Sequence, residues 1–216
     1  QDQQTDFSDD VFGLSGSVGS LYKVSDDQTV YLNLASGFRA PDMGERFQDA
    51  IVNFGEPHAV IGKKDLDPER SWSAELGSKL ETRPVRYEMA TFVNKVQDYI
   101  GEEDLGRIRG FSTEQYNNMG DVTFYGAEAA ATWTIVDQLD LYGNAGRTWT
   151  TEEEKADVPA WIFNYGLRYT QPLNTEMLRT AYASVYLRTA LESEQKTVNP
   201  GRQAFPDNNA FTTVNA

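Results

Sequence analysis

The sequence predicts an all-β fold, an antiparallel transmembrane β-barrel. The chain of 216 residues is expected to supply about eight strands and the start of a ninth. Three observations lead to this prediction. Hydrophobic residues recur with a period of two along most of the chain, and the connections between the predicted strands are short and long in turn. No uncharged stretch approaches the roughly 20 apolar residues that a transmembrane helix needs, so strands would have to cross the membrane.

The strand signal begins near the N-terminus. Phe12, Leu14, Val18 and Tyr22 fall on one face of an extended chain, whereas the residues between them are mostly small or polar. This alternation is typical of a half-buried strand, and it recurs downstream. It predicts strands near residues 11–24, 29–39, 71–81, 86–100, 119–136, 139–150, 160–171 and 178–191, with a further strand opening at 210. Membrane barrels need about 9–11 tilted residues per strand, and most of these segments are long enough.

The apolar face of these strands is expected to lie against lipid. The large side chains that mark it are Trp72, Leu76, Trp133, Ile135, Trp161, Phe163 and Leu187. Glu75 and Glu128 fall on the other face and are expected to point into the lumen. The strand near 86–100 is less regular, because Phe92 falls on the face opposite Met89 and Val93.

The connections carry a second signal. Short turns are predicted near residues 25–28, 82–85, 136–138 and 172–176, and longer segments at 40–70, 101–118, 151–159 and 192–209. An up-and-down barrel has this rhythm, because its short periplasmic turns lie at one end and its long extracellular loops at the other. A soluble Greek-key sandwich, the alternative all-β fold, has no reason to keep it.

Composition removes several classes of function. The chain has no cysteine, which excludes disulfides and thiolate metal sites, and a single histidine leaves little room for imidazole-based metal binding. The net charge of −14 argues against a nucleic-acid partner. No signal peptide opens the chain and both ends look cut. We therefore expect residues 1–216 to be part of one β-barrel domain in a longer protein.

Several short motifs resemble those of one family. The segment Ala35-Ser36-Gly37-Phe38-Arg39-Ala40-Pro41 resembles the Gly-Phe-Arg-Ala-Pro box of TonB-dependent receptors. Residues Asp65-Leu66-Asp67-Pro68-Glu69-Arg70-Ser71 resemble their Asn-Pro-x-Leu-x-Pro-Glu box, although Lys63-Lys64 stands where Asn-Pro is usual. Downstream, Glu75-Leu76-Gly77 and Tyr125-Gly126-Ala127-Glu128 resemble two strand motifs of the same family. The order and spacing of the boxes are more specific than any one of them.

The resemblance implies a fold and a function. Receptors of this family enclose an N-terminal plug in a barrel of about 22 strands. They lie in the outer membrane of Gram-negative bacteria, in contact with its lipid, and take energy from the TonB–ExbB–ExbD complex through a box ahead of the plug. The plug and the remaining strands are not in this chain. The implied activity is import of a metal chelate such as a ferric siderophore, with no cofactor.

Two sets of ligand-binding residues follow from the two possible cargoes. If the cargo is haem, His58 in the long segment 40–70 would supply an axial nitrogen, since receptors of this kind carry a histidine in that region. The alternative is an exposed loop histidine with no role. If the cargo is a siderophore, recognition would fall on aromatic and basic residues such as Arg46, Phe47 and Arg107. The siderophore reading is favoured, because Lys63-Lys64 breaks a box that helps define the haem group.

The motif residues Phe38, Arg39, Ala40, Pro41, Leu66, Pro68 and Glu69 are more simply explained by structure than by ligand binding. Pro41 would end the strand ladder, and Arg39 would pair with a carboxylate inside the barrel.

An outer-membrane barrel enzyme and a passive, porin-like channel are the alternatives from other classes. An enzyme needs a nucleophile with an adjacent base. His58 is the one possible imidazole base, and no elbow motif surrounds any serine, so no enzymatic activity is expected.

Overall fold

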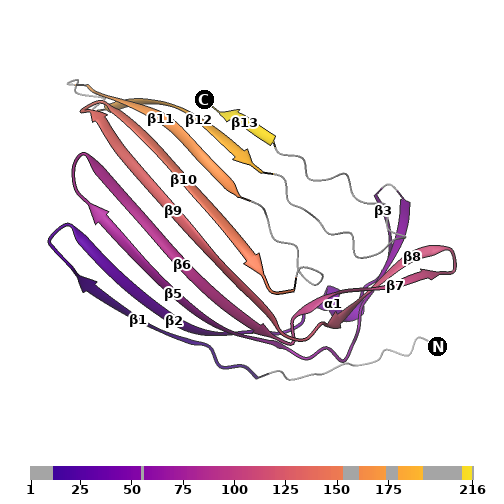
Figure 1. Ribbon diagram of the computed structural model, residues 1–216. Coiled ribbons are helices and arrows are strands. Elements are labelled where there is room, and N and C mark those ends of the chain that lie inside the picture. The colour runs from indigo at the N-terminus through magenta and orange to yellow at the C-terminus, as the bar shows by residue number, and fades with distance from the viewer. Residues whose placement is uncertain (1–11, 55, 153–160, 174–179, 192–210, 216) are drawn as a thin grey trace. The chain divides into compact units, whose positions relative to one another are not determined.

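The computed structural model describes residues 12–54, 56–152, 161–173, 180–191 and 211–215. Its main element is a nine-stranded sheet in the order β1-β2-β5-β6-β9-β10-β11-β12-β13 (Figure 1). The strands are β1 Gly16–Lys23, β2 Gln28–Arg39, β5 Glu69–Glu81, β6 Val85–Gln97, β9 Val122–Val136, β10 Leu139–Thr150, β11 Ile162–Pro172, β12 Thr180–Ala190 and β13 Phe211–Asn215. These are the nine strands that the period-two pattern predicts, with ends that differ by a few residues.

The strands pair in sequence order through antiparallel ladders. Ala131 of β9 lies opposite Gly143 of β10, and Gly143 lies opposite Tyr165 of β11. The turn between β1 and β2 is closed by the Val24 amide, which donates to the Gln28 carbonyl at 2.9 Å. The turn between β9 and β10 leaves only residues 137–138 between the strands. These short connections confirm the turns predicted near residues 25–28 and 136–138, and a third short connection joins β5 to β6 near the predicted turn at 82–85. The turn predicted near 172–176 lies mostly outside the described residues. Neighbouring strands joined so closely must be antiparallel.

By compactness the chain divides into two units. One unit contains residues 1–17, 35–72 and 96–121. The other contains residues 18–34, 73–95 and 122–216, with most of the nine-stranded sheet.

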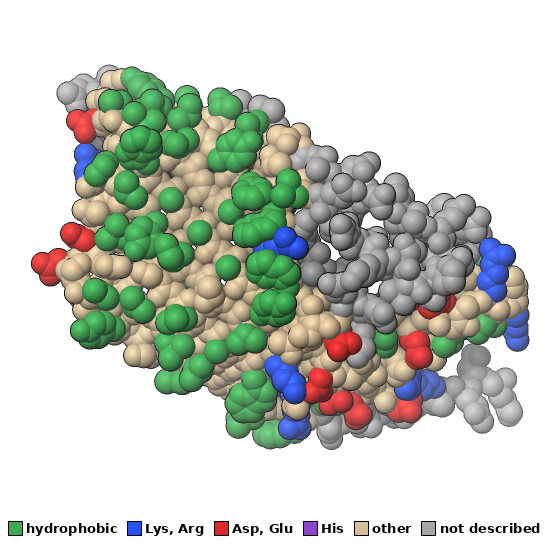
Figure 2. All heavy atoms as spheres, viewed as in Figure 1, with side chains coloured by type: hydrophobic (Ala, Val, Ile, Leu, Met, Phe, Trp, Pro, Cys, Tyr) green, Lys and Arg blue, Asp and Glu red, His purple; other side chains and the backbone are tan. Residues whose placement is uncertain are grey.

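One face of the nine-stranded sheet is apolar and exposed (Figure 2). Trp72 is 62% exposed, Leu76 54% and Trp133 51%. Ile135 is also exposed, and Trp161, Phe163 and Leu187 are partly exposed. A soluble protein rarely leaves so extensive an apolar surface uncovered. The exposure is what lipid-facing strands require.

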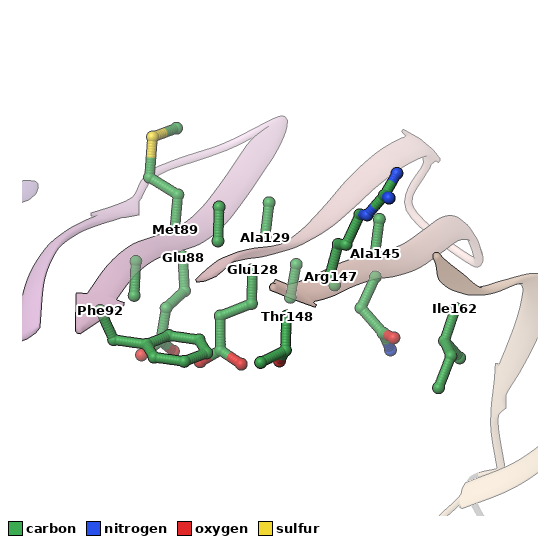
Figure 3. Close-up of a pocket in the computed structure, with 14 residues that line it drawn as sticks. Glu88, Met89, Phe92, Glu128, Ala129, Ala145, Arg147, Thr148 and Ile162 are labelled. Carbon is green, nitrogen blue, oxygen red and sulfur yellow. The ribbon is translucent and has the colours of Figure 1, made fainter. Parts of the chain in front are cut away.

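The opposite face is polar. In Figure 3, Glu88, Glu128 and Thr148 point to the side opposite Met89, Ala129 and Arg147. Their side of the sheet is hollowed by a depression of about 550 Å³. The alternation of polar and apolar side chains is therefore that of a strand between lumen and lipid.

Phe92 lies on this polar face, as its place in the sequence predicts. Its ring occupies the space over Gly126, where a Cβ atom would come within 2.5 Å of the ring and of the Arg147 carbonyl oxygen. A large side chain on β6 is thus matched by the absence of one on β9. This explains why the pattern of β6 alone looks irregular.

The predictions of simple loops at 40–70 and 101–118 were wrong in their local structure. These segments contain a helix, α1 Met43–Phe47, and four strands, β3 Asp49–Phe54, β4 Glu56–Ile61, β7 Ile100–Ile108 and β8 Phe111–Asn118. The strands form a second sheet in the order β3-β4-β8-β7. Its centre is a parallel pair, β4 with β8, formed by segments about 50 residues apart that no local turn joins. No helix within the described ranges is long and apolar enough to cross a membrane.

The other long connections predicted, 151–159 and 192–209, lie almost entirely outside the described residues.

Candidate functional site

The first family-like box contributes the centre of an ion-pair cluster. Arg39, at the end of β2, donates from Nε and Nη2 to the two carboxylate oxygens of Glu69 at 2.7 Å each. Its Nη1 donates to both oxygens of Glu45, at 2.8 and 3.0 Å. The side chains of both glutamates are only 12% exposed. Paired hydrogen bonds from a guanidinium to a carboxylate are strong and directional. Arg39 therefore joins the end of β2 to α1 and to the start of β5, all within one compact unit. Its pairing with carboxylates fits the structural interpretation of the motif.

Glu45 also caps helix α1. Asp42 Oδ1 accepts a hydrogen bond from the Glu45 amide, and Glu45 Oε2 accepts one from the Asp42 amide, both at 2.8 Å. This reciprocal arrangement is a capping box, which satisfies amides that a helix start leaves without partners. A five-residue helix is not stable by itself. Because Glu45 both completes the capping box and pairs with Arg39, the bond to Arg39 holds the start of α1 in place.

The second family-like box is anchored by a residue far along the chain. Asn118 at the end of β8 accepts from the Asp67 amide at 2.9 Å and donates to the Asp67 carbonyl at 3.0 Å. Leu66 is 3% exposed, and the Glu69 carboxylate accepts a further bond from the Ile100 amide at 2.8 Å. Residues of this box thus join the start of β5 to β7 and β8. Burial of the Leu66 side chain adds an apolar contribution to the stability of this region.

The electrostatics of the cluster follow from these bonds. Burial raises the pKa of Glu69, but hydrogen bonds from Arg39 and from the Ile100 amide outweigh it and hold that pKa below the usual value. The hydrogen bond to Glu69 raises the pKa of Arg39 further above its usual value. Burial together with the negative charge of Glu102 raises the pKa of the Tyr116 hydroxyl to about 12. Arg39 and Glu69 are therefore ionised near neutral pH, and Tyr116 is neutral there.

We expect the anchoring of α1 to weaken in acid. The folded-state pKa of Glu69 lies below its unfolded value, so its contribution to stability is complete above the unfolded value and is lost as pH falls through the folded one. Hydrogen exchange of the α1 amides, corrected for intrinsic rates, should show more frequent opening at pH 3 than at pH 7 in the complete receptor. In the Glu69→Gln variant the difference should shrink, and an unchanged difference would contradict the assignment.

Two predicted ligand-binding residues come together in the second sheet. His58 of β4 lies opposite Ser112 of β8, and Ser112 lies opposite Arg107 of β7. Residues opposite one another on paired strands project from the same face. His58 and Arg107 therefore share a face, although 49 positions separate them in the sequence. His58 is half-buried and Arg107 is exposed.

The other two predicted ligand-binding residues lie side by side on α1. The Arg46 side chain is 8% exposed, so the structure places it inside this unit rather than at a surface. Phe47 is 36% exposed, and the Lys64 ammonium lies 5.9 Å from the centre of its ring. Of this pair, only Phe47 is open to a ligand arriving from solvent. In the part of the chain that the structure describes, no group of three or more His, Cys, Asp or Glu residues could hold a metal ion.

The lysines that depart from the family-like box have structural roles. Lys63 Nζ donates to Asn117 Oδ1 at 2.7 Å, and Asn117 donates in turn to Glu103 at 2.6 Å. Gly62, just before them, lets the chain pass against α1, because a Cβ there would lie 2.6 Å from the Arg46 carbonyl carbon. Gly62, Asn117 and Asn118 are not among the residues predicted from the sequence to form the site. The polar run Tyr116-Asn117-Asn118 ahead of Gly120 is a signal that could have indicated the two asparagines.

Comparison with known proteins identifies the family. All of residues 1–216 match the family described as "TonB dependent receptor-like, beta-barrel". The chain belongs to the TonB-dependent receptors. No curated protein matches this receptor chain in sequence.

Solved structures show the same fold. The copper transporter OprC superposes with a TM-score of 0.71 at 19% identity, over 93% of this chain and 30% of its own length. The siderophore receptor PirA of Pseudomonas aeruginosa gives 0.59 at 17%, over 82% of this chain and 35% of its own. The iron transporter FrpB of Neisseria meningitidis gives 0.57 at 12%, over 84% and 27%. The receptor chain thus spans about a third of the length of these proteins, and its nine strands are part of a larger transmembrane barrel.

Proposed function

We propose that the complete receptor imports a metal chelate, such as a ferric siderophore, across the outer membrane of a Gram-negative bacterium. Membership of the TonB-dependent receptors over residues 1–216 carries the proposal. Import of this kind needs a plug and the TonB–ExbB–ExbD complex, which would act through segments outside this chain. The structures of similar fold are named as copper, siderophore and iron transport proteins, which supports a metal-bearing cargo but not a particular one.

The second sheet is the proposed first contact for the cargo. It arises from the long connections, which in a membrane barrel of this type lie at the extracellular end. Exposed Arg107 and half-buried His58 share one of its faces, and partly exposed Phe47 belongs to the same compact unit. A guanidinium suits an anionic chelate, because it donates several hydrogen bonds in a fixed plane. Arg46 would support α1 from within rather than touch the cargo.

Arg107→Ala should weaken binding of an anionic chelate to the complete receptor. We expect a loss of about tenfold in affinity for ferric enterobactin as the probe, because one charge-assisted contact is removed. Titration followed by quenching of tryptophan fluorescence would measure it. Arg109→Ala is the matched control, since Arg109 is an exposed arginine in the β7–β8 turn. Equal affinities of wild type and Arg107→Ala would remove Arg107 from the site.

The same protein tests the haem alternative through His58. Under the siderophore proposal, haem titration of the complete receptor leaves the Soret band unchanged, and the His58→Ala substitution does not alter that result. A shifted Soret band that His58→Ala abolishes would replace the siderophore proposal with haem uptake. A complete gene that encodes no plug would overturn both and favour a passive channel.

A further inference from the structure

A row of aromatic rings crosses three neighbouring strands on the apolar face of the main sheet. Tyr125 of β9 stacks on Trp149 of β10, with ring centres 5.8 Å apart. Trp149 meets Trp161 edge-on at 6.1 Å, and Trp161 stacks on Phe163 of β11 at 5.7 Å. Trp149 and Trp161 lie at the strand ends remote from the short turn at 137–138. Membrane barrels carry such aromatic girdles where the hydrocarbon meets the headgroups.

Arg147 lies within this row. Its guanidinium carbon is 4.9 Å from the ring centre of Trp149 and 6.0 Å from that of Trp161. Arg147 is two residues from Trp149 along β10, so both project from the same face. Figure 3 shows Arg147 on the side of Met89 and Ala129, away from Glu88 and Glu128. An arginine therefore stands on the face that meets lipid.

The depth of Arg147 can be judged from the strand. It is eight positions beyond Leu139, the first residue of β10. At a rise of about 3.4 Å per residue and a tilt of about 40°, this is roughly 20 Å along the membrane normal. The apolar band of such barrels is about 25 Å tall, so Arg147 sits near the outer border of the hydrocarbon and its guanidinium can reach the headgroup layer.

A cation at this border needs an anion. No carboxylate among the described residues forms an ion pair with Arg147, and Glu88 and Glu128 point to the other face. A guanidinium that lies over aromatic rings can still donate hydrogen bonds from its N–H groups. Two such N–H groups match two oxygens of a phosphate. We propose that Arg147, held by Trp149 and Trp161, binds a phosphate of a lipid headgroup in the outer leaflet.

The chain offers a matched control for this site. Arg168 of β11 also stacks on an aromatic ring, 5.0 Å from the centre of Tyr142. Arg168 lies opposite Asp140, and Tyr142 is two residues further along β10, so this pair projects from the polar face. The two arginines thus have similar ring contacts on opposite faces of one sheet. Only Arg147 is placed to meet lipid.

The test uses the complete receptor, purified in detergent and exposed to lipid A as the phosphorylated lipid. Native mass spectrometry should show that Arg147→Gln retains about tenfold less lipid A than wild type, as expected for the loss of a charge-assisted pair. Arg147→Lys should retain an intermediate amount, because lysine keeps the positive charge but lacks the planar N–H donors of a guanidinium. Arg168→Gln should retain as much as wild type. The gel mobility of unheated samples checks that each variant is folded.

Dephosphorylated lipid A and inorganic phosphate separate the possible sources of the anion. When the phosphates of lipid A are removed, wild-type receptor should retain no more lipid than Arg147→Gln does. Millimolar inorganic phosphate should not displace lipid A from the wild-type receptor. Equal retention by wild type and Arg147→Gln would overturn the proposal. So would displacement by inorganic phosphate, or an equal loss in Arg168→Gln. Uptake of the metal chelate is a separate readout, so failure of this proposal leaves the proposed function untouched.

Discussion

Replacement of Ala129 by arginine is expected to destabilise the receptor barrel by about 2–4 kcal/mol, the cost of a charge on the lipid face near the middle of the membrane. Ala129 lies opposite Ala145 in β10, and Ala145 lies opposite Phe163 in β11. Figure 3 shows Ala129 on the side of Met89, away from the carboxylates. Urea-induced unfolding of the complete receptor in lipid vesicles would measure the loss.

Ala130→Arg is the matched control for this prediction. Ala130 is the next residue, it is also exposed, and it lies opposite Asn144 on the polar face. An added arginine there meets water and polar groups, so we expect a change within about 0.5 kcal/mol. The pair differs only in the face of β9 from which the side chain projects. Equal losses in the two variants would contradict the assignment of lipid and lumen faces.

Arg39→Gln is expected to release helix α1 from the ends of β2 and β5. The substitution leaves the carboxylates of Glu45 and Glu69 close together, nearly buried and without their shared cation. The cost should be about 1–2 kcal/mol, at the low end for a lost partner because Arg39 itself is partly exposed to solvent. Hydrogen exchange of the α1 and β3 amides should accelerate about tenfold, with little change in β10 and β11.

A double-mutant cycle separates the pair from the general effect of the substitution. If Arg39 acts through Glu69, the loss in the Arg39→Gln, Glu69→Gln double variant should be smaller than the sum of the two single losses. Lys79→Gln serves as the control, because Lys79 pairs with Glu88 between two exposed side chains and should contribute little. Additive losses would mean that the bidentate contact does not stabilise the cluster.

Local sequence determined the nine strands of the main sheet. Alternation of hydrophobic and polar residues is a property of neighbours two positions apart, and short turns fix the pairing of the strands on either side of them. Both signals are present in segments such as 122–150, where β9 and β10 meet through a two-residue connection. The polar position of Phe92 could be read from the sequence, but the space over Gly126 that accepts its ring could not.

Only the tertiary structure decided the second sheet and its contacts. The parallel pairing of β4 with β8, the bond from Lys63 to Asn117 and the two bonds from Arg39 to Glu69 join residues 30 or more positions apart. The sequence indicates that Arg39 pairs with a carboxylate, but not that Glu45 and Glu69 share it. It marks His58 and Arg107 separately as candidate ligand-binding residues, but does not place them on one face of a sheet. Such pairings depend on which distant segments the folded chain brings together, and the local pattern of hydrophobic residues does not indicate them.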